Sequence, residues 1–311
     1  MIQNIVNNIE QLNALKHKGV GIIIGNFDGV HRGHQFLIEE FVNKCKSAQI
    51  TPVVLTFNPH PIIYLNKKTG AYLLNTYDER NDLLLSRNIE VIVELDFNKS
   101  LQQLSSEEFF KSYLFEICNL KLIYLGHDFS LGNGKVPAKE LLEKMVAEYD
   151  VNLCESKPFY IKEEVVSSSS IREYLKAGNI KKVSNFLGRE YCLCENVVNG
   201  YGVGKKELVP TANIQISPDQ LHPKSGVYFT KTKYDNKIYD SITNIGFRPS
   251  LQDDSGLSIE TNILNFSKEI YQQKICIEFL KFHRDEKKFE SKEELLKQIH
   301  ADIKAREQFH D

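Results

Sequence analysis

The sequence predicts two domains: a parallel α/β sheet with helices on both faces, then a small antiparallel β-barrel with a C-terminal helix. In the first half, strand-like and helix-like segments alternate, which is the order of a parallel sheet covered by helices. After about residue 185, short strand-like segments follow one another, separated by Gly, Pro, Asn and Asp. This pattern, closed by one long helical segment, is typical of a small barrel.

In the first half, apolar runs predict the strands and capping patterns predict the helix starts. The expected strands are Val20–Ile24, Thr51–Phe57, Ile89–Leu95 and Leu122–Leu125. The expected helices begin near Gly33, at Thr76 and at Ser105, and the last two starts carry a glutamate three residues later. Such a capping box satisfies backbone N–H groups at a helix start, so it marks where the helix begins.

In the second half, five segments read as strands before a single helix. They are Tyr191–Val198, Val227–Lys231, Lys237–Ile245, Ser258–Leu264 and Lys274–Leu280. Ser291 and Glu294 form another capping box, followed by apolar residues at helical spacing. We expect the boundary near residues 183–188, which gives domains of residues 1–185 and 186–311.

Composition argues against broad attraction to nucleic acids or membranes. The 39 basic and 41 acidic residues nearly cancel, leaving a net charge of −2. The first 19 residues are polar, and no apolar run approaches the roughly 20 residues of a membrane-spanning helix. We therefore expect a cytoplasmic protein with small-molecule partners, no nucleic-acid or membrane partner, and a monomeric or weakly homo-oligomeric state.

Six cysteines are present, without a CxxC pair. Cys192 and Cys194 are two residues apart, so on a strand their side chains share one face. They could begin a metal or redox site, or they could be small apolar side chains in a reducing compartment. We expect the second.

The strongest local signal is the segment Gly25–His34, which follows an apolar strand and opens a helix. Helix starts at this edge of an α/β sheet bind phosphate groups through their N–H groups. The expected nucleotide-binding residues here are Gly25, Asn26, Phe27, Asp28 and Gly33. Asp28 could also bind a metal. His31 and His34 are three residues apart, so both project from one side of the first helical turn.

The His31-Arg-Gly-His34 pattern resembles the HxGH signature of nucleotidyltransferases with a Rossmann-like fold. In that superfamily the histidines contact nucleotide phosphates. Such chemistry needs no general base when the attacking group is an ionised phosphate, so catalysis depends on alignment and on stabilising charge at the reacting phosphorus. We expect His31 and His34 to be catalytic in this way.

Two further segments fit the same site. Ser167, Ser168 and Ser169 gather hydroxyls at a helix start, with Arg172 one turn in, which suits a triphosphate. Read alone, this is equally a serine-rich helix cap with a surface arginine. We expect Arg172 to be catalytic together with the two histidines. Thr56–Pro61 ends a strand, where ligand-contacting loops usually lie, although it could be only a proline turn.

In the second half, Thr211 and Asn213 are two residues apart, so in an extended segment both oxygens face the same way. Hydroxyl and amide oxygens suit a cation such as Mg²⁺ and phosphates. Glu260 lies on the polar face of an alternating strand and could be a general base. More often such a glutamate is a solvated strand residue.

Together these segments resemble the bacterial two-domain riboflavin kinase/FAD synthetase family over nearly the whole chain. In the first half the matching segments are Gly25–His34, Thr56–Pro61, Gly126–Gly132 and Ser167–Arg172. Asn58 stands where the family usually has glutamate, and Leu131 where it has phenylalanine. The resemblance implies transfer of AMP from ATP to FMN, giving FAD. It also implies flavin contacts from Phe57, Asn58, Pro59, His60, Asp128 and Phe129.

The second half matches at Leu187–Tyr191, Pro210–Asn213, Gly226–Tyr228, Asn244–Pro249, Glu260 and Arg284–Glu286. The resemblance implies a riboflavin kinase in which Thr211 and Asn213 hold Mg²⁺ and ATP, Glu260 activates the 5′-hydroxyl of riboflavin, and Arg284 contacts the flavin. Leu208 replaces a usual glycine, and Glu207 adds negative charge beside the expected phosphates. The alternatives are therefore a monofunctional FAD synthetase with an inactive barrel, or a flavin- or nucleotide-binding regulator.

Overall fold

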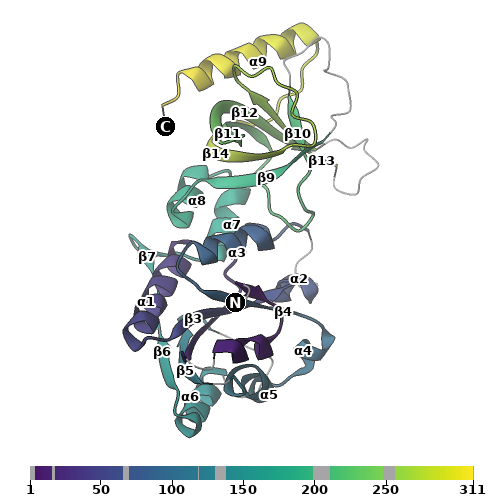
Figure 1. Cartoon of the computed structure of the whole chain (residues 1–311). Coiled ribbons are helices and arrows are strands. Elements are labelled where there is room, and N and C mark those ends of the chain that lie inside the picture. Colours follow the sequence, from purple (N-terminus) through teal and green to yellow (C-terminus); the bar gives the residue numbers. More distant parts are fainter. Residues whose placement is uncertain are drawn as a thin grey trace. The chain divides into compact units, whose positions relative to one another are not determined.

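The structure is a computed structural model that describes residues 4–15, 18–65, 70–117, 119–129, 138–198, 211–247 and 256–310. The chain divides into two compact units, Met1–Ser168 and Ser169–Asp311 (Figure 1). The first contains a six-stranded parallel sheet and the second a closed barrel. This confirms the predicted fold class. None of the helices in the described part of the chain combines the length and apolar character needed to cross a bilayer.

The sheet of the first unit has the strand order β1-β4-β3-β2-β5-β6, and all of its pairings are parallel. The strands are β1 (Ile5–Val6), β2 (Val20–Ile24), β3 (Thr51–Asn58), β4 (Val91–Asp96), β5 (Leu120–Leu125) and β6 (Asn152–Glu155). The chain passes from β2 outward through β3 to β4, and then returns to the other side of β2 as β5. Ligands of open α/β sheets bind outside the carboxyl ends of the strands at such a reversal. The loop after β2 lies there.

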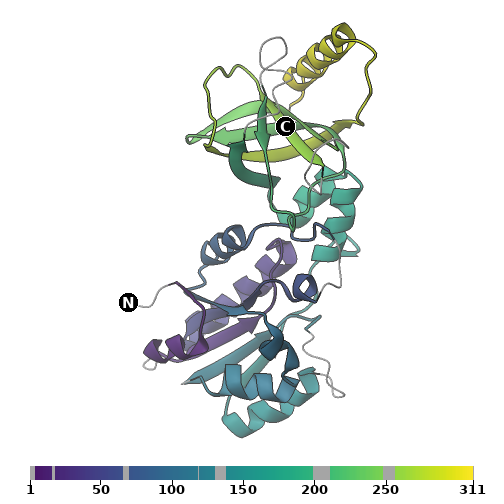
Figure 2. The same cartoon turned by 90° about the vertical axis from the view of Figure 1, so that its right-hand side faces the viewer.

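Helices cover both faces of this sheet (Figure 2). The helical segments of this unit are η1 (Ile9–Leu15), α1 (Arg32–Ala48), α2 (Pro61–Tyr64), α3 (Tyr77–Leu85), α4 (Lys99–Gln103), α5 (Ser106–Phe110), its continuation η2 (Lys111–Phe115) and α6 (Ala138–Tyr149). Ile23 of β2 packs in one core layer with Phe41 of α1, whereas its neighbour Ile22 packs in the other with Leu142 of α6. A strand buried on both faces explains why β2 reads as a continuous apolar run.

Between the sheet and the barrel, the chain forms a small hairpin and two helices. The hairpin strands are β7 (Tyr160–Ile161) and β8 (Glu164–Val165), and the helices are α7 (Ser168–Lys176) and α8 (Ile180–Leu187). The first residue of α7 belongs to the first unit and the rest of the helix to the second.

The second unit is a closed barrel of six strands in the order β10-β13-β12-β11-β14-β9. Its strands are β9 (Tyr191–Val198), β10 (Ala212–Ile214), β11 (Gly226–Tyr234), β12 (Lys237–Phe247), β13 (Leu257–Ile263) and β14 (Lys274–Arg284). Buried Tyr228 and Phe279 are among the side chains that fill its interior. Buried hydroxyls bond one another across three strands, as in Thr230 to Thr243 at 2.9 Å. Because the interior is occupied, we expect ligand-binding side chains on the outer surface or rim.

The C-terminal helix α9 (Lys292–Glu307) begins at Ser291, as the capping pattern predicts, and packs against the barrel (Figure 2). Arg306 is only 2% exposed and donates to Asp240 at 2.7 Å. Asp302 accepts from Arg284 of β14 at 2.7 Å and from Gln298 at 2.8 Å. Burial alone would raise the pKa of Asp302, but the hydrogen bonds and charge of these partners outweigh it, so the pKa is lowered.

The Asp302–Arg284 pair predicts an acid-sensitive docking of α9. Because the folded pKa of Asp302 lies below its ordinary value of 3.8, the stabilisation is complete above that pH and is lost as the pH falls through the folded pKa. We expect Asp302→Asn to lower the free energy of unfolding by roughly 1.5–3 kcal/mol at pH 7 and by much less at pH 2. Urea unfolding of both proteins at the two pH values measures this, and an equal loss at both would contradict it.

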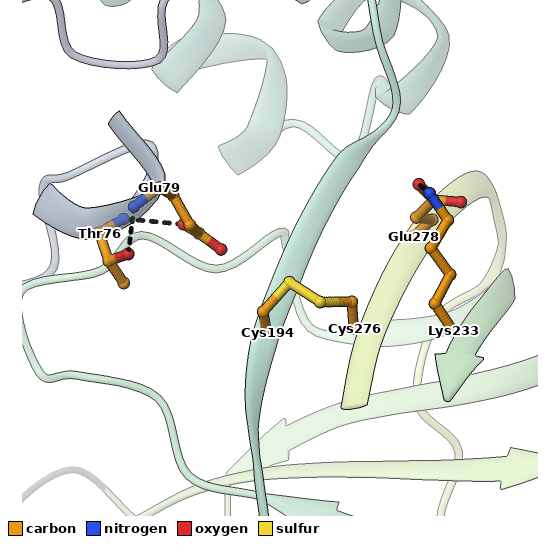
Figure 3. The surroundings of a disulfide bond; sticks show 6 residues. All are labelled: Thr76, Glu79, Cys194, Lys233, Cys276 and Glu278. Atoms are coloured by element: carbon orange, nitrogen blue, oxygen red, sulfur yellow. Dashed lines mark hydrogen bonds and ion pairs between the residues drawn. A yellow bond between two sulfur atoms is a disulfide. The ribbon is translucent and has the colours of Figure 1, made fainter. Parts of the chain in front are cut away.

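A disulfide joins Cys194 of β9 to Cys276 of β14 (Figure 3). The expectation that Cys194 is only a small apolar side chain is therefore wrong. The two residues are 82 positions apart in the sequence but are direct partners in the antiparallel register, with Cα atoms 4.0 Å apart. Spacing along the chain does not reveal such a partner. Cys45, Cys154 and Cys192 form no disulfide, and burial raises the pKa of the Cys45 thiol to about 12, which keeps it unreactive.

We expect the disulfide to stabilise the barrel because it closes a long loop of the unfolded chain. Removing such a crosslink typically costs about 2–4 kcal/mol. Reduction should therefore lower the guanidinium concentration at the midpoint of barrel unfolding. Cys276→Ser should lower this midpoint as well, and adding reductant should not lower it further. Cys45→Ala, which leaves the crosslink intact, should keep the response to reductant. Equal midpoints with and without reductant in the original protein would contradict the prediction.

Candidate active sites

The loop after β2 has an unusual backbone that aims it at the start of α1. Phe27 and Val30 have φ values of 53° and 37°, and Gly29 has a φ of 82°. A Cβ added at Gly33 would lie 3.1 Å from both the ring of His31 and the carbonyl of Val166. The absence of a side chain at Gly33 therefore lets the first turn of α1 approach the segment before α7.

The two histidines lie together at the N-terminus of α1. His31 is the N-cap, and its Nδ1 accepts from the backbone N–H of His34 at 3.2 Å. The two rings stack with centroids 3.6 Å apart and planes 15° apart. Because Nδ1 of His31 is an acceptor, the neutral ring carries its proton on Nε2, where it is a hydrogen-bond donor. Two imidazoles and the helix N-terminus thus form one anion-binding arrangement.

Asp28 holds the loop to a neighbouring segment. Its carboxylate is buried and accepts from the N–H of Leu74 at 2.9 Å, while Asn75 Oδ1 accepts from the N–H of Gly29 at 2.5 Å. The sequence suggested that Asp28 could position a ligand or bind a metal. In the structure one of its carboxylate oxygens accepts a hydrogen bond from the backbone of Leu74. Asn26 Oδ1 is buried and has no hydrogen-bond partner among the residues that the structure describes. It is an acceptor available to a ligand.

Arg80 of α3 organises the ends of β2 and β3, and sequence reasoning did not single it out. Its side chain is 2% exposed, and it donates to the carbonyls of Phe57 at 3.0 Å and Asn26 at 3.4 Å. Its other terminal nitrogen pairs with Glu94 of β4. Burial lowers the pKa of this guanidinium, and the charge of Glu94 opposes that effect. A glutamate inside the apolar run of β4 was the available signal, since a buried carboxylate needs a partner.

A small pocket opens beside these groups. Its lining comes from the β2 loop, the loop after β3 and the start of α3: Asn26, Asp28, His60, Leu73, Asn75, Thr76, Tyr77 and Arg80. The ring Nδ1 of His60 caps α2 by accepting from the backbone N–H of Ile62 at 3.1 Å. The backbone N–H of His60 donates to the Tyr77 hydroxyl at 2.7 Å. The pocket therefore joins the HxGH loop to the predicted flavin-binding segment.

Removing Arg80 should destabilise the first unit. In Arg80→Met the partly buried carboxylate of Glu94 loses its cation, and breaking a largely buried pair in this way costs about 3–5 kcal/mol. Arg87→Met, in an exposed position just after the same helix, is the matched control and should change stability by less than about 0.5 kcal/mol. Urea unfolding followed by circular dichroism measures both. Similar small losses in both variants would show that the Arg80–Glu94 pair contributes little.

The serine-rich segment meets the β2 loop. Ser168 is the first residue of α7, and its hydroxyl donates to the backbone carbonyl of Asp28 at 2.8 Å. The structure thus brings Ser168 to the loop, with Ser167 and Ser169 as its neighbours in sequence. Arg172 lies one turn further along α7 and is buried.

The predicted flavin-binding residues differ in their surroundings. Phe57 is 5% exposed, and its ring packs in the core against Phe97 and Phe109, so it supports the loop from within. Asn58 donates to Glu94 at 3.0 Å, and the bond to Pro59 is cis. The side chain of Asp128 is 79% exposed after β5. Phe129 is partly buried against the core, and Leu131 lies outside the described residues.

On the barrel, the predicted kinase residues share one outer face. Asn213 of β10 is the direct cross-strand partner of Glu260 of β13, while their neighbours Ile214 and Ile259 are buried. Partners in an antiparallel register point to the same side of the sheet. Ser258 donates to Glu260 at 2.9 Å, and Thr211 lies two residues before Asn213. The altered loop with Glu207 and Leu208, together with Val209, lies outside the described residues.

Arg284, which the resemblance assigns to the flavin, bonds residues of the protein itself. Its Nε donates to both oxygens of Asp302, at 3.1 and 3.2 Å, and its Nη1 donates to the carbonyl of Asp285 at 3.0 Å. The guanidinium therefore anchors α9 to the end of β14. Most of its donors are already used within the protein.

The outward donors at the end of β10 fit a magnesium ion. Asn213 offers an amide oxygen, and Glu260 lies directly across from it in the register. Thr211, just before β10, is exposed and offers a hydroxyl. Mg²⁺ prefers oxygen ligands of this kind and keeps several waters or phosphate oxygens.

Two family models match successive parts of the chain. FAD synthetase matches residues 13–170, and riboflavin kinase matches residues 187–310. Curated relatives called bifunctional riboflavin kinase/FMN adenylyltransferase include the following three. The protein of Buchnera aphidicola (Acyrthosiphon pisum, strain APS) is 34% identical, covering 96% of this chain and 94% of the relative. The Listeria monocytogenes protein is 29% identical, covering 90% and 88%. The Escherichia coli K12 protein is 27% identical, covering 98% and 97%.

A solved structure shares the fold across both units. It is titled a macrolide-efflux protein from Streptococcus pneumoniae, is 26% identical, covers 100% of both chains and has a TM-score of 0.84. The order of the two family matches is the order of the sheet and the barrel, and the curated relatives match nearly from end to end. The chain therefore belongs to the bifunctional riboflavin kinase/FMN adenylyltransferase family.

Proposed function

We propose that this protein makes FAD from riboflavin in two ATP-dependent steps, one on each domain. The barrel phosphorylates riboflavin to FMN, and the α/β domain transfers AMP from a second ATP to FMN. The observation that carries the proposal is the coexistence of two separate constellations: the stacked His31 and His34 at the start of α1, and the Asn213–Glu260 pair on the barrel. Both family models and the named relatives support the same pair of activities.

In the adenylyl transfer, an oxygen of the FMN phosphate attacks the α-phosphorus of ATP, and the bond to the bridging oxygen breaks to release pyrophosphate. The attacking oxygen is already ionised, so no side chain needs to remove a proton. His31, His34 and the N–H groups at the start of α1 stabilise the negative charge that builds on the reacting phosphorus. Ser167–Ser169 and Arg172 hold the triphosphate, and Gly25 and Phe27 shape the loop beneath it.

We place the flavin of FMN near the loop after β3, at the carboxyl edge of the sheet. His60 lies at this loop beside the β2 loop, Asn58 fixes the loop through Glu94, and Phe57 supports it from the core. Asp128 and Phe129 follow the neighbouring strand β5, at the same edge of the sheet. Asn26 Oδ1 supplies a buried acceptor for a donor of the bound ligand.

In the kinase step, the 5′-oxygen of riboflavin attacks the γ-phosphorus of ATP, and the bond to the bridging oxygen breaks to release ADP. The hydroxyl is neutral, so its proton must leave, and Glu260 on the outer face of β13 accepts it. Ser258 holds one oxygen of Glu260, which fixes the orientation of the carboxylate. Thr211 and Asn213 would hold Mg²⁺, whose charge offsets that of the ATP phosphates when it is bound.

The functional boundary that fits these roles follows residue 185, with residues 1–185 as the adenylyltransferase and residues 186–311 as the kinase. Helix α7 carries Ser168, which bonds the β2 loop, and Arg172, so we assign it to the first activity. The kinase family match begins at residue 187, after this helix.

The two leaving groups provide a direct test. With FMN and ATP the purified protein should release pyrophosphate but not ADP, and with riboflavin and ATP it should release ADP before pyrophosphate. Enzyme-coupled assays that respond separately to pyrophosphate and to ADP follow both. Release of pyrophosphate with FMN but of no ADP with riboflavin would indicate a monofunctional synthetase. Release of neither product would indicate a protein that binds these ligands without catalysis.

A further inference from the structure

Charged residues end β14 and continue beyond it, and the first two, Arg284 and Asp285, are engaged in structural pairs. Arg284 bonds Asp302 of α9, and Asp285 pairs with Lys224 at 2.6 Å. Glu286 is exposed, and within the described ranges no lysine, arginine or histidine forms an ion pair with it. Its negative charge is therefore not neutralised by the fold as those of its neighbours are.

The carboxylate of Glu286 lies over the outer face of β12, where Gly246 leaves room for it. A Cβ added at Gly246 would come within 2.1 Å of Glu286 Oε1 and 2.8 Å of its Cδ. Asn244, two residues earlier on the same face, donates its amide to the same oxygen at 3.4 Å. The glycine and the amide together fix where the carboxylate rests, although the side chain itself is exposed.

This position is next to the predicted base. Asn244 is the direct register partner of Glu260, and Gly246 is the partner of Ser258, which donates to Glu260. Residues Thr243 and Ile245, which alternate with Asn244 and Gly246, are buried in the barrel. Glu260, Asn244 and the carboxylate of Glu286 therefore occupy one outer surface, and diagonal neighbours on such a surface are about 7–8 Å apart.

We propose that Glu286 binds hydroxyl groups of the ribityl chain of riboflavin and so sets the polyol in line with Glu260. The inference rests on the proposed kinase activity of the barrel. A carboxylate accepts hydrogen bonds from vicinal hydroxyls and repels phosphates. Because this carboxylate lies beside Glu260, the base proposed for the riboflavin hydroxyl, it suits the ribityl polyol. The distance of one diagonal step matches the separation between a terminal hydroxyl held at Glu260 and hydroxyls further along the same chain.

Two variants test this role in different ways. Glu286→Ala deletes the carboxylate, and Gly246→Ala displaces it while leaving it present. Loss of a hydrogen bond to a charged group corresponds to roughly a tenfold to hundredfold loss of affinity. We expect both variants to raise the KM for riboflavin by that factor with little change in kcat, whereas a base such as Glu260 acts on kcat.

Flavin fluorescence titrations supply a readout independent of turnover. Riboflavin should bind the Glu286→Ala protein about tenfold or more weakly, while lumiflavin, which has a methyl group in place of the ribityl chain, should bind both proteins equally. Asp285→Asn, which removes the adjacent charge, is the control and should leave riboflavin binding unchanged. Unchanged riboflavin affinity in Glu286→Ala would overturn the inference, and so would an equal loss of affinity for riboflavin and lumiflavin. Either result is compatible with phosphorylation of riboflavin by the original protein. If the original protein neither binds nor phosphorylates riboflavin, the proposed kinase function fails and this inference fails with it.

Discussion

Replacing His34 by alanine should reduce the rate of FAD formation from FMN about 100- to 1000-fold. That is the usual effect of removing one preorganised donor from the place where transition-state charge develops. The structure gives the reason: the His34 ring stacks on His31 at 3.6 Å, at the N-terminus of α1. Phosphorylation of riboflavin by the same protein should be unchanged, because the kinase residues lie on the separate barrel.

The measurement is the initial rate of FAD formation at saturating FMN and ATP, with His300→Ala as the control. His300 is an exposed residue of α9, so its loss should leave the rate unchanged. A His34→Ala protein within threefold of the original rate would contradict the role assigned to the ring. His31→Ala should differ by also lowering stability by about 0.5–2 kcal/mol, because His31 caps α1.

Replacing Glu260 by glutamine should reduce riboflavin phosphorylation about 100- to 10,000-fold, which is the range contributed by a positioned general base. Glutamine keeps the size of the side chain but does not accept a proton. The fold should be unaffected, since Glu260 points away from the barrel interior between Asn213 and Asn244. Adenylyl transfer to FMN should proceed at the original rate.

The control for this variant is Glu269→Gln, an exposed glutamate beyond the end of β13. Both proteins are compared by ADP release at saturating riboflavin. A Glu260→Gln protein that retains the original rate would exclude Glu260 as the base.

Much of the fold could be predicted from the sequence because its signals are local. The apolar run of β2 and the capping boxes at Thr76 and Ser105 act over a few residues, and both capping boxes are present in the structure. β10 was not predicted as a strand because it has only three residues, too few to show alternation. Helix α6 was not predicted either, although its moderate amphipathic pattern contains apolar residues at helical spacing.

What the sequence could not show are the partners that the fold brings together. Arg80 on a helix forms an ion pair with Glu94 on a strand, and Arg284 on a strand forms one with Asp302 on a helix. Cys194 and Cys276 form a disulfide between two paired strands. Each pairing depends on register or on the packing of separate elements, which periodicity does not specify. The motif at Gly25–His34 was visible because its residues are adjacent in the chain. The carboxylate of Glu286 over Gly246 was not, because the two are far apart in the sequence.

The central claim is that one chain carries both activities, and product analysis by chromatography tests it most directly. Purified protein is incubated with ATP and Mg²⁺, with riboflavin in one tube and FMN in another. We expect FAD in both tubes, with FMN appearing transiently in the first. FAD from FMN alone, with riboflavin untouched in a folded sample, would contradict the account and leave a synthetase with an inactive kinase barrel.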